Sequence, residues 1–174
     1  MSASIRSKKG SMAELGPVLF VLLFMFVIPM INLGSLATRY ALAMTVCREA
    51  AHQSAVSYTF EKGSPGKPSA IEAVDAAVSS TVARFAGIKI VSKDIDIIAT
   101  DVNTEAIDRF TDKLTAPANT QSNIYTLETI LVADLSPLIT YTGPFLSNIP
   151  GLTGPYRVRL CAREFAENPQ GLNQ

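Results

Sequence analysis

The sequence contains no tryptophan, one histidine and two cysteines, and aromatic residues make up only 7% of the chain. Few aromatic rings argue against a surface that stacks nucleobases or sugars. Fifteen acidic and fifteen basic side chains give a formal net charge of zero, and no basic cluster occurs outside the first ten residues. Nucleic-acid binding is therefore not expected.

Motifs of common enzyme families are also missing. There is no Gly-x-Ser-x-Gly elbow, no Walker loop and no Cys-x-x-Cys pair. His52, the single histidine, has no Cys, Asp or Glu four residues away. Residues 101–112 resemble a calcium loop only faintly, because the sixth position lacks glycine. We predict no enzyme activity, metal, cofactor or small-molecule substrate.

A long hydrophobic run is the most informative feature present. Residues 15–37 are largely apolar, and Leu15 to Ile31 carries no charge. At about 1.5 Å per residue, a helix of this length just spans a hydrocarbon core of roughly 30 Å. The sequence therefore predicts a single transmembrane helix in contact with membrane lipid.

The basic leader, residues 1–10, indicates the orientation of this helix. By the positive-inside rule it stays in the cytoplasm, and the residues after about 38 lie outside. A cleaved secretory signal fits less well, because the apolar run is longer than a signal's and Ala41-Leu42-Ala43 lies well past its end.

The remaining pattern predicts one α+β domain on a helical stalk. Residues 11–60 form a long N-terminal helix, and residues 61–174 form an extracytoplasmic domain with a small antiparallel sheet and one or two extra helices. Small residues recur on one face of the stalk at Ala43, Cys47, Ala50, Ser54 and Tyr58. The expected elements are a helix that starts with a Ser69–Glu72 capping box, a strand over 88–100, a short helix over 104–114, and strands over 125–135 and 156–165.

Several short motifs, in their order along the chain, carry a resemblance to one family. They are Lys8-Lys9-Gly10, Glu14-Leu15, Asn32-Leu33-Gly34, Arg48-Glu49-Ala50-Ala51 and Val132–Pro137. The chain resembles the TadE/TadG-like pseudopilins of tight-adherence (Tad, Flp-type) pili, relatives of type IV pilins. The resemblance implies a pilin-like fold and cleavage by a prepilin peptidase between Gly10 and Ser11.

The same resemblance implies a structural function in cell adhesion. The protein would be a minor pilin of the bacterial inner membrane, with a periplasmic domain, that joins other pilin-like subunits and the assembly platform of a Tad-type pilus or secretion system. It would initiate, anchor or support that structure and could be incorporated in the pilus. The alternative is a membrane-tethered binding module whose helix is a passive anchor.

Two residues depart from the family pattern. The family's Glu usually stands fifth after the cleavage site, whereas Glu14 is fourth after Gly10, a slip that rotates the side chain by about 100° on a helix. Asn32 stands where the family often has Asp. In the pilin interpretation, Glu14 pairs with the new ammonium of a neighbour's Ser11; alternatively, it only snorkels to the interface. Small residues such as Gly34 would let helices pack closely.

Two further features are left open by the sequence. Cys47 and Cys161 lie on the same side of the membrane, so they could form a disulfide or remain as two buried thiols. The Pro/Gly-rich segment 136–155 carries apolar residues that could contact a partner or roof the core. The residues proposed for a partner are Tyr141, Phe145, Leu146 and Ile149.

Overall fold

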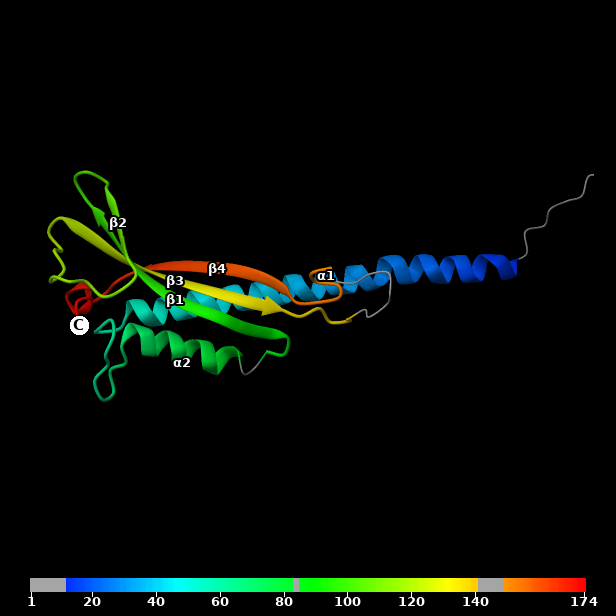
Figure 1. Ribbon diagram of the computed structural model, residues 1–174, viewed down its shortest axis with the longest axis horizontal. Helices are drawn as coiled ribbons and strands as arrows, with labels where there is room; N and C mark the ends of the chain where they lie inside the picture. Colours follow the sequence, from blue (N-terminus) through cyan, green and yellow to red (C-terminus); the bar gives the residue numbers. More distant parts are fainter. Residues whose placement is uncertain (1–11, 83–84, 141–148) are drawn as a thin grey trace, which may run out of the picture.

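The computed structural model describes residues 12–82, 85–140 and 149–174, and the side chains at 12–14 and 81–82 lie outside this description. Two helices and four strands follow one another along the chain, and a short 3₁₀ helix closes it (Figure 1). Their bounds are α1 Met12–Ala55, α2 Ala70–Val82, β1 Ile88–Asp101, β2 Ile107–Phe110, β3 Asn123–Leu135, β4 Tyr156–Phe165 and η1 Pro169–Gly171.

The predicted α+β class is confirmed, and the general layout is pilin-like. The C-terminal half of α1 and the whole of α2 lie on one face of an antiparallel sheet of strand order β2-β1-β3-β4. The N-terminal half of α1 extends away from the domain as a single rod (Figure 1). The long helix continues through Pro17 and Pro29 but ends at Ala55, earlier than the predicted residue 60.

The sheet forms where the sequence places β-branched and aromatic residues. β4 has the predicted bounds, and β1 and β3 differ from the predictions by one or two residues at an end. β3 is central and pairs with β1 from Asn123 to Leu135 and with β4 from Thr126 to Leu135. An irregularity between Ile90 and Ser92 shifts the register of β1, which explains the imperfect alternation of its sequence.

The predicted helix over 104–114 is wrong. The chain reverses there and forms the short strand β2, which pairs with the end of β1. The carboxylate of Asp101 accepts hydrogen bonds from the backbone N–H groups of Asn103 and Thr104, both at 2.8 Å. Glu105 has a φ of 57°, and the N–H of Asp101 donates to the carbonyl of Ala106. This local turn outweighs the weak helical spacing of the apolar residues.

The start of α2 was predicted correctly. The N–H of Ser69 donates to Glu72 Oε2 at 3.0 Å, and the N–H of Glu72 donates to Ser69 Oγ at 3.2 Å. This is the reciprocal capping box. Among the apolar side chains of α2, Val74 and Val78 are buried, whereas Ile71 is exposed.

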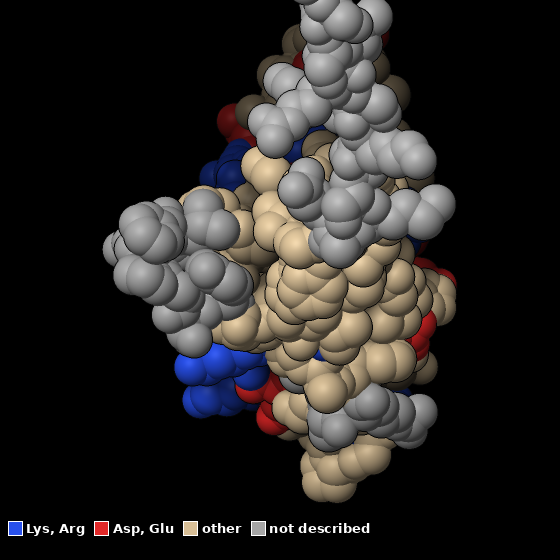
Figure 2. All heavy atoms as spheres, turned by 90° about the vertical axis from the view of Figure 1, so that its right-hand side faces the viewer, with Lys and Arg blue, Asp and Glu red and all other residues tan. Residues whose placement is uncertain are grey.

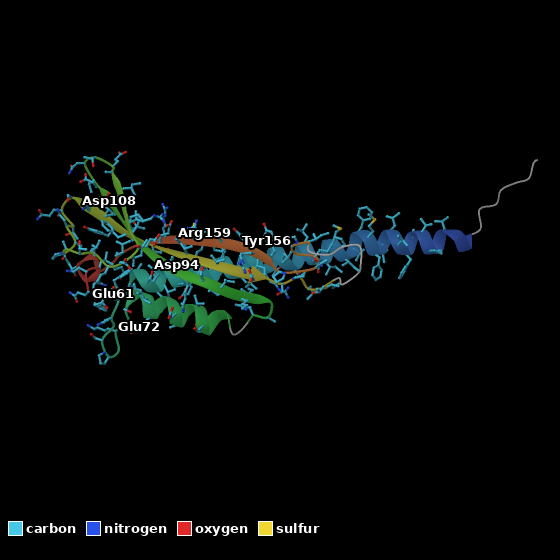
Figure 3. The ribbon with its side chains drawn as sticks, viewed as in Figure 1. Glu61, Glu72, Asp94, Asp108, Tyr156 and Arg159 are labelled. Atoms are coloured by element: carbon cyan, nitrogen blue, oxygen red, sulfur yellow. The ribbon has the colours of Figure 1, made fainter. Side chains whose placement is uncertain are left out.

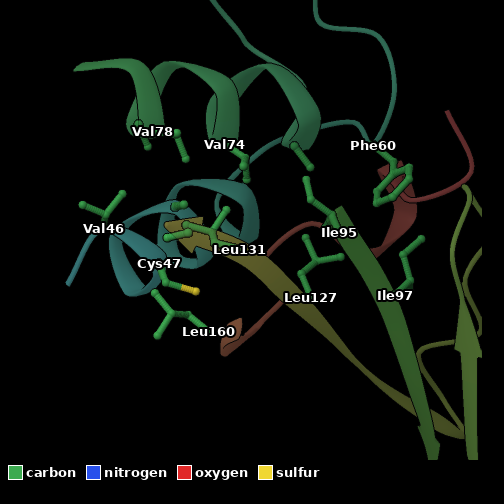
Figure 4. Close-up of a cluster of buried hydrophobic side chains, with 14 of the residues drawn as sticks. Val46, Cys47, Phe60, Val74, Val78, Ile95, Ile97, Leu127, Leu131 and Leu160 are labelled. Atoms are coloured by element: carbon green, nitrogen blue, oxygen red, sulfur yellow. The ribbon is translucent and has the colours of Figure 1, made fainter. Parts of the chain in front are cut away.

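The core lies between the sheet and the two helices (Figure 4). The predicted small-residue face of α1 is buried at Ala43, Cys47, Ala50 and Ser54, but Tyr58 follows the helix and is exposed. Large side chains from the strands fill the other side of the core: Ile95, Ile97, Leu127, Leu131 and Leu160. Small residues on the helix therefore let the sheet approach it closely.

Candidate assembly surface and the junction of helix and domain

The N-terminal half of α1 presents apolar side chains on all sides. Its large hydrophobic residues from Leu15 to Ile31 are each between 40% and 72% exposed, apart from the partly buried Ile28. A helix that is apolar all round is suited to lipid or to other apolar helices rather than to water. It is the one helix within the described residues that is long and apolar enough to cross a membrane.

The two predicted assembly residues lie at opposite ends of this rod, Glu14 at its start and Gly34 just past Ile31. Gly10 and Ser11 lie outside the described residues. Glu14 falls in the first turn of α1, with its side chain outside the description. Gly34 is exposed, and a Cβ placed on it would meet no atom within 4 Å. Its bare backbone therefore faces open space, where a neighbouring helix could come close.

Asn32 marks the point at which the domain first binds the helix. Its side chain is 2% exposed, although it lies within the apolar run. Asn32 Nδ2 donates to the carbonyl of Ile139 at 2.8 Å, and the N–H of Ile139 donates to Asn32 Oδ1 at 2.9 Å. One amide side chain thus satisfies both backbone groups of a single residue in the segment after β3.

Arg39, two helical turns further along, makes the second attachment. Its guanidinium donates to the carbonyl of Ser136, whose own N–H donates to the carbonyl of Gly87 at 2.9 Å. Gly87 has a φ of 85°, and a Cβ at this position would collide with the Arg39 guanidinium. The C-terminal end of β3 and the start of β1 are therefore both held at the turn of α1 that carries Arg39.

The segment after β3 was predicted to contact a partner or to roof the core. Tyr141, Phe145 and Leu146 lie outside the described residues. Ile149 is 40% exposed and begins a tight turn in which its N–H donates to Thr153 Oγ1 at 2.7 Å. Gly151 in this turn has a φ of 79° and approaches the side chain of Leu36. Ile149 therefore points outward beside the helix and does not cover the core.

The outer face of the sheet carries a chain of ion pairs that sequence reasoning missed. Asp96 is only 7% exposed and binds Arg109 at 2.8 Å. Arg109 also binds Glu128 at 2.5 Å, and Arg163 binds the same carboxylate at 2.6 Å. The alternation of acids on β1 and β3 with arginines on β4 was the available signal, and the strand register brings the charges together.

The arginines determine the charge state of these acids. Desolvation by burial would raise the pKa of Glu128, but the hydrogen bonds and charges of Arg163 and Arg109 together hold it below the usual value. At the end of β3 and the start of β4, Arg157 donates two hydrogen bonds, of 2.7 and 2.9 Å, to the carboxylate of Asp134. The hydrogen bond from Arg157 lowers the pKa of Asp134. All three arginines thus neutralise carboxylates.

Arg159 differs from these arginines because it is exposed on β4 and has no ion pair among the described residues (Figure 3). The other two arginines of β4, Arg157 and Arg163, both pair with carboxylates of β3.

The two cysteines are free thiols, so the structure does not contain the disulfide considered above. Cys47 is fully buried on the helix side of the sheet, with its Sγ 3.5 Å from the carbonyl of Thr129. Cys161 is exposed, because its neighbour Leu160 points inward and strand alternation turns Cys161 outward. The alternative of two buried thiols therefore holds only for Cys47. Burial raises the pKa of Cys47 to about 11.

The domain shows little that resembles a reaction centre. Among the described residues, no cluster of three or more His, Cys, Asp or Glu side chains could hold a metal ion, and His52 is exposed on α1. A recess of about 270 Å³ lies between α2 and β1 and is rimmed by acids. Lys93 and Lys113 pair with Asp75 and Glu61 at its rim.

Comparison with protein-family models gave no match for this chain, and neither curated proteins nor solved structures gave one.

Proposed function

We propose that the protein is a pseudopilin-like subunit of the bacterial inner membrane that co-assembles with other pilin-like subunits through the exposed half of α1. The leader would lie in the cytoplasm and the α+β domain in the periplasm. One observation carries this proposal: a single helix is buried in its own domain along one half and exposes large apolar side chains along the other.

The exposed half is suited to lateral packing against other helices. No described residue of the domain packs against α1 between Leu15 and Val27, so a partner helix would meet only lipid-facing side chains there. Gly34 and Ala37 lie near its end and would permit close approach of backbones. A passive anchor needs only hydrophobic length, and it gains nothing from small residues at this level.

Glu14 would set the register between subunits. A carboxylate at the helix centre costs about 2.5–3.5 kcal/mol to insert into a membrane, and less near the edge. The ammonium of a processed Ser11 on a neighbour would neutralise this charge, which would make the fully inserted subunit more stable in an assembly than alone. A competing role is purely local, because a carboxylate in the first turn of a helix interacts favourably with the helix dipole.

The first experiment determines the mature N-terminal residue of the protein isolated from membranes of its native host. We expect a chain that begins at Ser11. An intact Met1 would remove the basis for pairing and would support the tethered alternative.

The second experiment compares Glu14→Gln with Glu49→Gln. Glu49 is an exposed glutamate further along the same helix, where it accepts a hydrogen bond from Gln53 at 2.8 Å. Both variants should insert into the membrane in normal amounts. We expect Glu14→Gln to lose co-purification with other pilin-like subunits and Glu49→Gln to retain it. Equal co-purification of both variants would contradict an assembly role for Glu14.

The tethered binding module remains the second candidate, and the outer face of the sheet favours it. No described helix covers this face, and Arg159 points away from α1 there (Figures 1 and 3). An anionic partner could bind at this position. Under this alternative, Arg159→Ala would abolish partner capture while Glu14→Gln would have no effect.

A further inference from the structure

We propose that the base of the domain sits in the outer interface of the bilayer and contacts lipid through an apolar collar. The collar consists of six residues around the point where α1 enters the domain: Leu33, Tyr40, Leu138, Ile139, Ile149 and Tyr156. This inference rests on the proposed membrane anchoring by α1 and adds a second lipid-contacting element.

The collar is exposed and continuous with the apolar rod. Its six side chains are between 38% and 70% exposed. Leu33, Tyr40 and Tyr156 line one apolar recess of about 420 Å³, together with Pro150, which follows Ile149. Ile139 is bound to Asn32, directly beside Leu33. Single exposed apolar residues are common, but a contiguous set that adjoins a larger apolar surface indicates an interaction site.

The length of the rod supports lipid as the occupant. The seventeen residues from Leu15 to Ile31 span about 25 Å as a helix, whereas a hydrocarbon core measures roughly 30 Å. If Glu14 marks the cytoplasmic edge, the remaining thickness of about 5 Å corresponds to roughly three more residues and ends near Gly34. At this level the domain already contacts the helix, because Asn32 binds Ile139 and Leu36 meets Gly151. The collar therefore lies at the outer boundary of the hydrocarbon core.

Asn32 reduces the cost of placing the irregular backbone after β3 close to the hydrocarbon core. Unpaired backbone N–H and C=O groups are costly near lipid, where water cannot bind them. The two hydrogen bonds of Asn32 satisfy both groups of Ile139, the residue that lies deepest beside the helix among the attachments described. Gly151 N–H likewise donates to the carbonyl of Gly154 at 2.8 Å.

The distribution of polar groups also fits an interface. Seen along the helix from its N-terminal end, the described atoms nearest the viewer are uncharged, and Lys, Arg, Asp and Glu show mainly towards the margins (Figure 2). Tyr156 lies closer to the rod than the labelled acids Glu61, Glu72 and Asp108, which lie towards the far end of the domain (Figure 3). Tyr40 and Tyr156 combine an apolar ring with a polar hydroxyl, as do the aromatic residues enriched at membrane surfaces.

The chain contains no tryptophan, so a single introduced tryptophan reports its own depth without background. The full chain is reconstituted in phosphatidylcholine vesicles, and its emission is compared in vesicles of the same lipid brominated in the acyl chains. Leu138→Trp tests the collar. Phe24→Trp in the rod is the positive control, and Val102→Trp, 57% exposed in the turn between β1 and β2, is the negative control.

We expect a roughly twofold loss of emission for Leu138→Trp, a larger loss for Phe24→Trp and none for Val102→Trp, because the bromine atoms lie within the hydrocarbon core. Quenching of Phe24→Trp alone would overturn the collar while leaving the anchor intact. Absence of quenching in Phe24→Trp would instead overturn the membrane anchoring on which the collar rests. Blue-shifted but unquenched emission from Leu138→Trp would mean that a second copy covers the collar, which also overturns the proposal.

Discussion

The two halves of α1 are both apolar, but they differ in the size of their side chains, and size decides what each half contacts. The exposed half is rich in Leu, Phe, Met and Val, and nearly all of these stay open. The buried half uses Ala43, Cys47, Ala50 and Ala51, which are fully buried under the sheet and α2. Apolar composition alone does not distinguish the exposed stretch of α1 from the stretch that packs against the domain. Side-chain volume along a continuous helix does.

The difference has a simple energetic reason. A helix packed against a rigid sheet must bring backbones close together, so small residues give the best density. A helix in lipid has a fluid partner and gains from every large side chain. Asn32 and Arg39 make the two polar attachments between α1 and the domain. They lie between the exposed half and the buried half of the helix and mark the boundary between them.

The largest expected effect comes from making the buried half resemble the exposed half. Ala50→Leu adds three carbon atoms at a position with no exposed surface. The overpacked core should lose about 3 kcal/mol of unfolding free energy, the upper end of the usual range, because the sheet cannot move away without breaking its other contacts. Urea unfolding of the detergent-solubilised chain, followed by circular dichroism, measures the change.

Ala41→Leu is the matched control, since Ala41 lies on the same helix but is exposed. It should change the unfolding free energy by less than about 0.5 kcal/mol. The reverse change in the other half, Phe24→Ala, should also leave the domain's stability unaltered. Equal destabilisation by Ala50→Leu and Ala41→Leu would refute the division of α1 by side-chain size.

The next effect concerns the boundary itself. Asn32→Asp restores the acidic residue that the resembled family often has, but it removes the Nδ2 donor to the carbonyl of Ile139. A carboxylate oxygen would then face that carbonyl, and we expect a loss of about 1–3 kcal/mol at neutral pH. Thermal unfolding at pH 7 and at pH 4 tests this prediction. A protonated Asp regains one donor, so the difference in stability between Asn32→Asp and the unaltered chain should be smaller at pH 4.

Asn103→Asp serves as the control for the general effect of adding a negative charge. The Asn103 side chain is exposed in the turn before β2, and only its backbone N–H has a hydrogen bond to Asp101. This variant should unfold like the unaltered chain at both pH values. An Asn32→Asp variant as stable as Asn103→Asp at neutral pH would show that the two hydrogen bonds to Ile139 contribute nothing.

Local patterns predicted those parts of the fold that depend on local energetics. Alternation and β-branching predicted β3 and β4, and the Ser-x-x-Glu spacing predicted the start of α2. The helix expected over 104–114 failed because the Asp101 turn overrides weak periodicity. The two hydrogen bonds between the Asn32 side chain and the backbone of Ile139 could not be predicted. Ile139 lies 107 residues further along the chain, and backbone groups carry no sequence signal. The roles of Glu14 and Gly34 stay predictions, because their partners would belong to other molecules.

The two faces of the sheet extend the comparison to charge. The inner face meets α1 through apolar contacts, whereas the outer face buries Glu128 between Arg109 and Arg163. Glu128→Gln should lower the unfolding free energy by about 1–2 kcal/mol at neutral pH, because Arg163 loses its charged partner and Arg109 keeps only Asp96. Glu164→Gln, an exposed change on β4, is the control and should have almost no effect.

The same carboxylate predicts a pH dependence. The folded pKa of Glu128 is held below its usual value of about 4.3, so its contribution to stability is complete at neutral pH and is lost as the pH falls below about 4. The Glu128→Gln variant should therefore lose less stability between pH 6 and pH 3 than the unaltered chain. Parallel pH profiles would show that the ion pairs do not stabilise the sheet.

The last prediction concerns the reactivity of the two thiols and involves no change in stability. Cys47 lies on α1, beneath the inner face of the sheet, and Cys161 lies on the outer face of β4. Cys161 is exposed and should react with a maleimide at neutral pH, whereas burial of Cys47, with its pKa raised to about 11, keeps it protonated and shielded. Mass spectrometry should find one label on the folded chain and two after denaturation. Cys161→Ser should remove the label from the folded chain, and Cys47→Ser should not. A folded chain from the native host that takes no label until it is reduced would instead carry a disulfide, which would require Cys161 to turn inward and β4 to shift its register against β3.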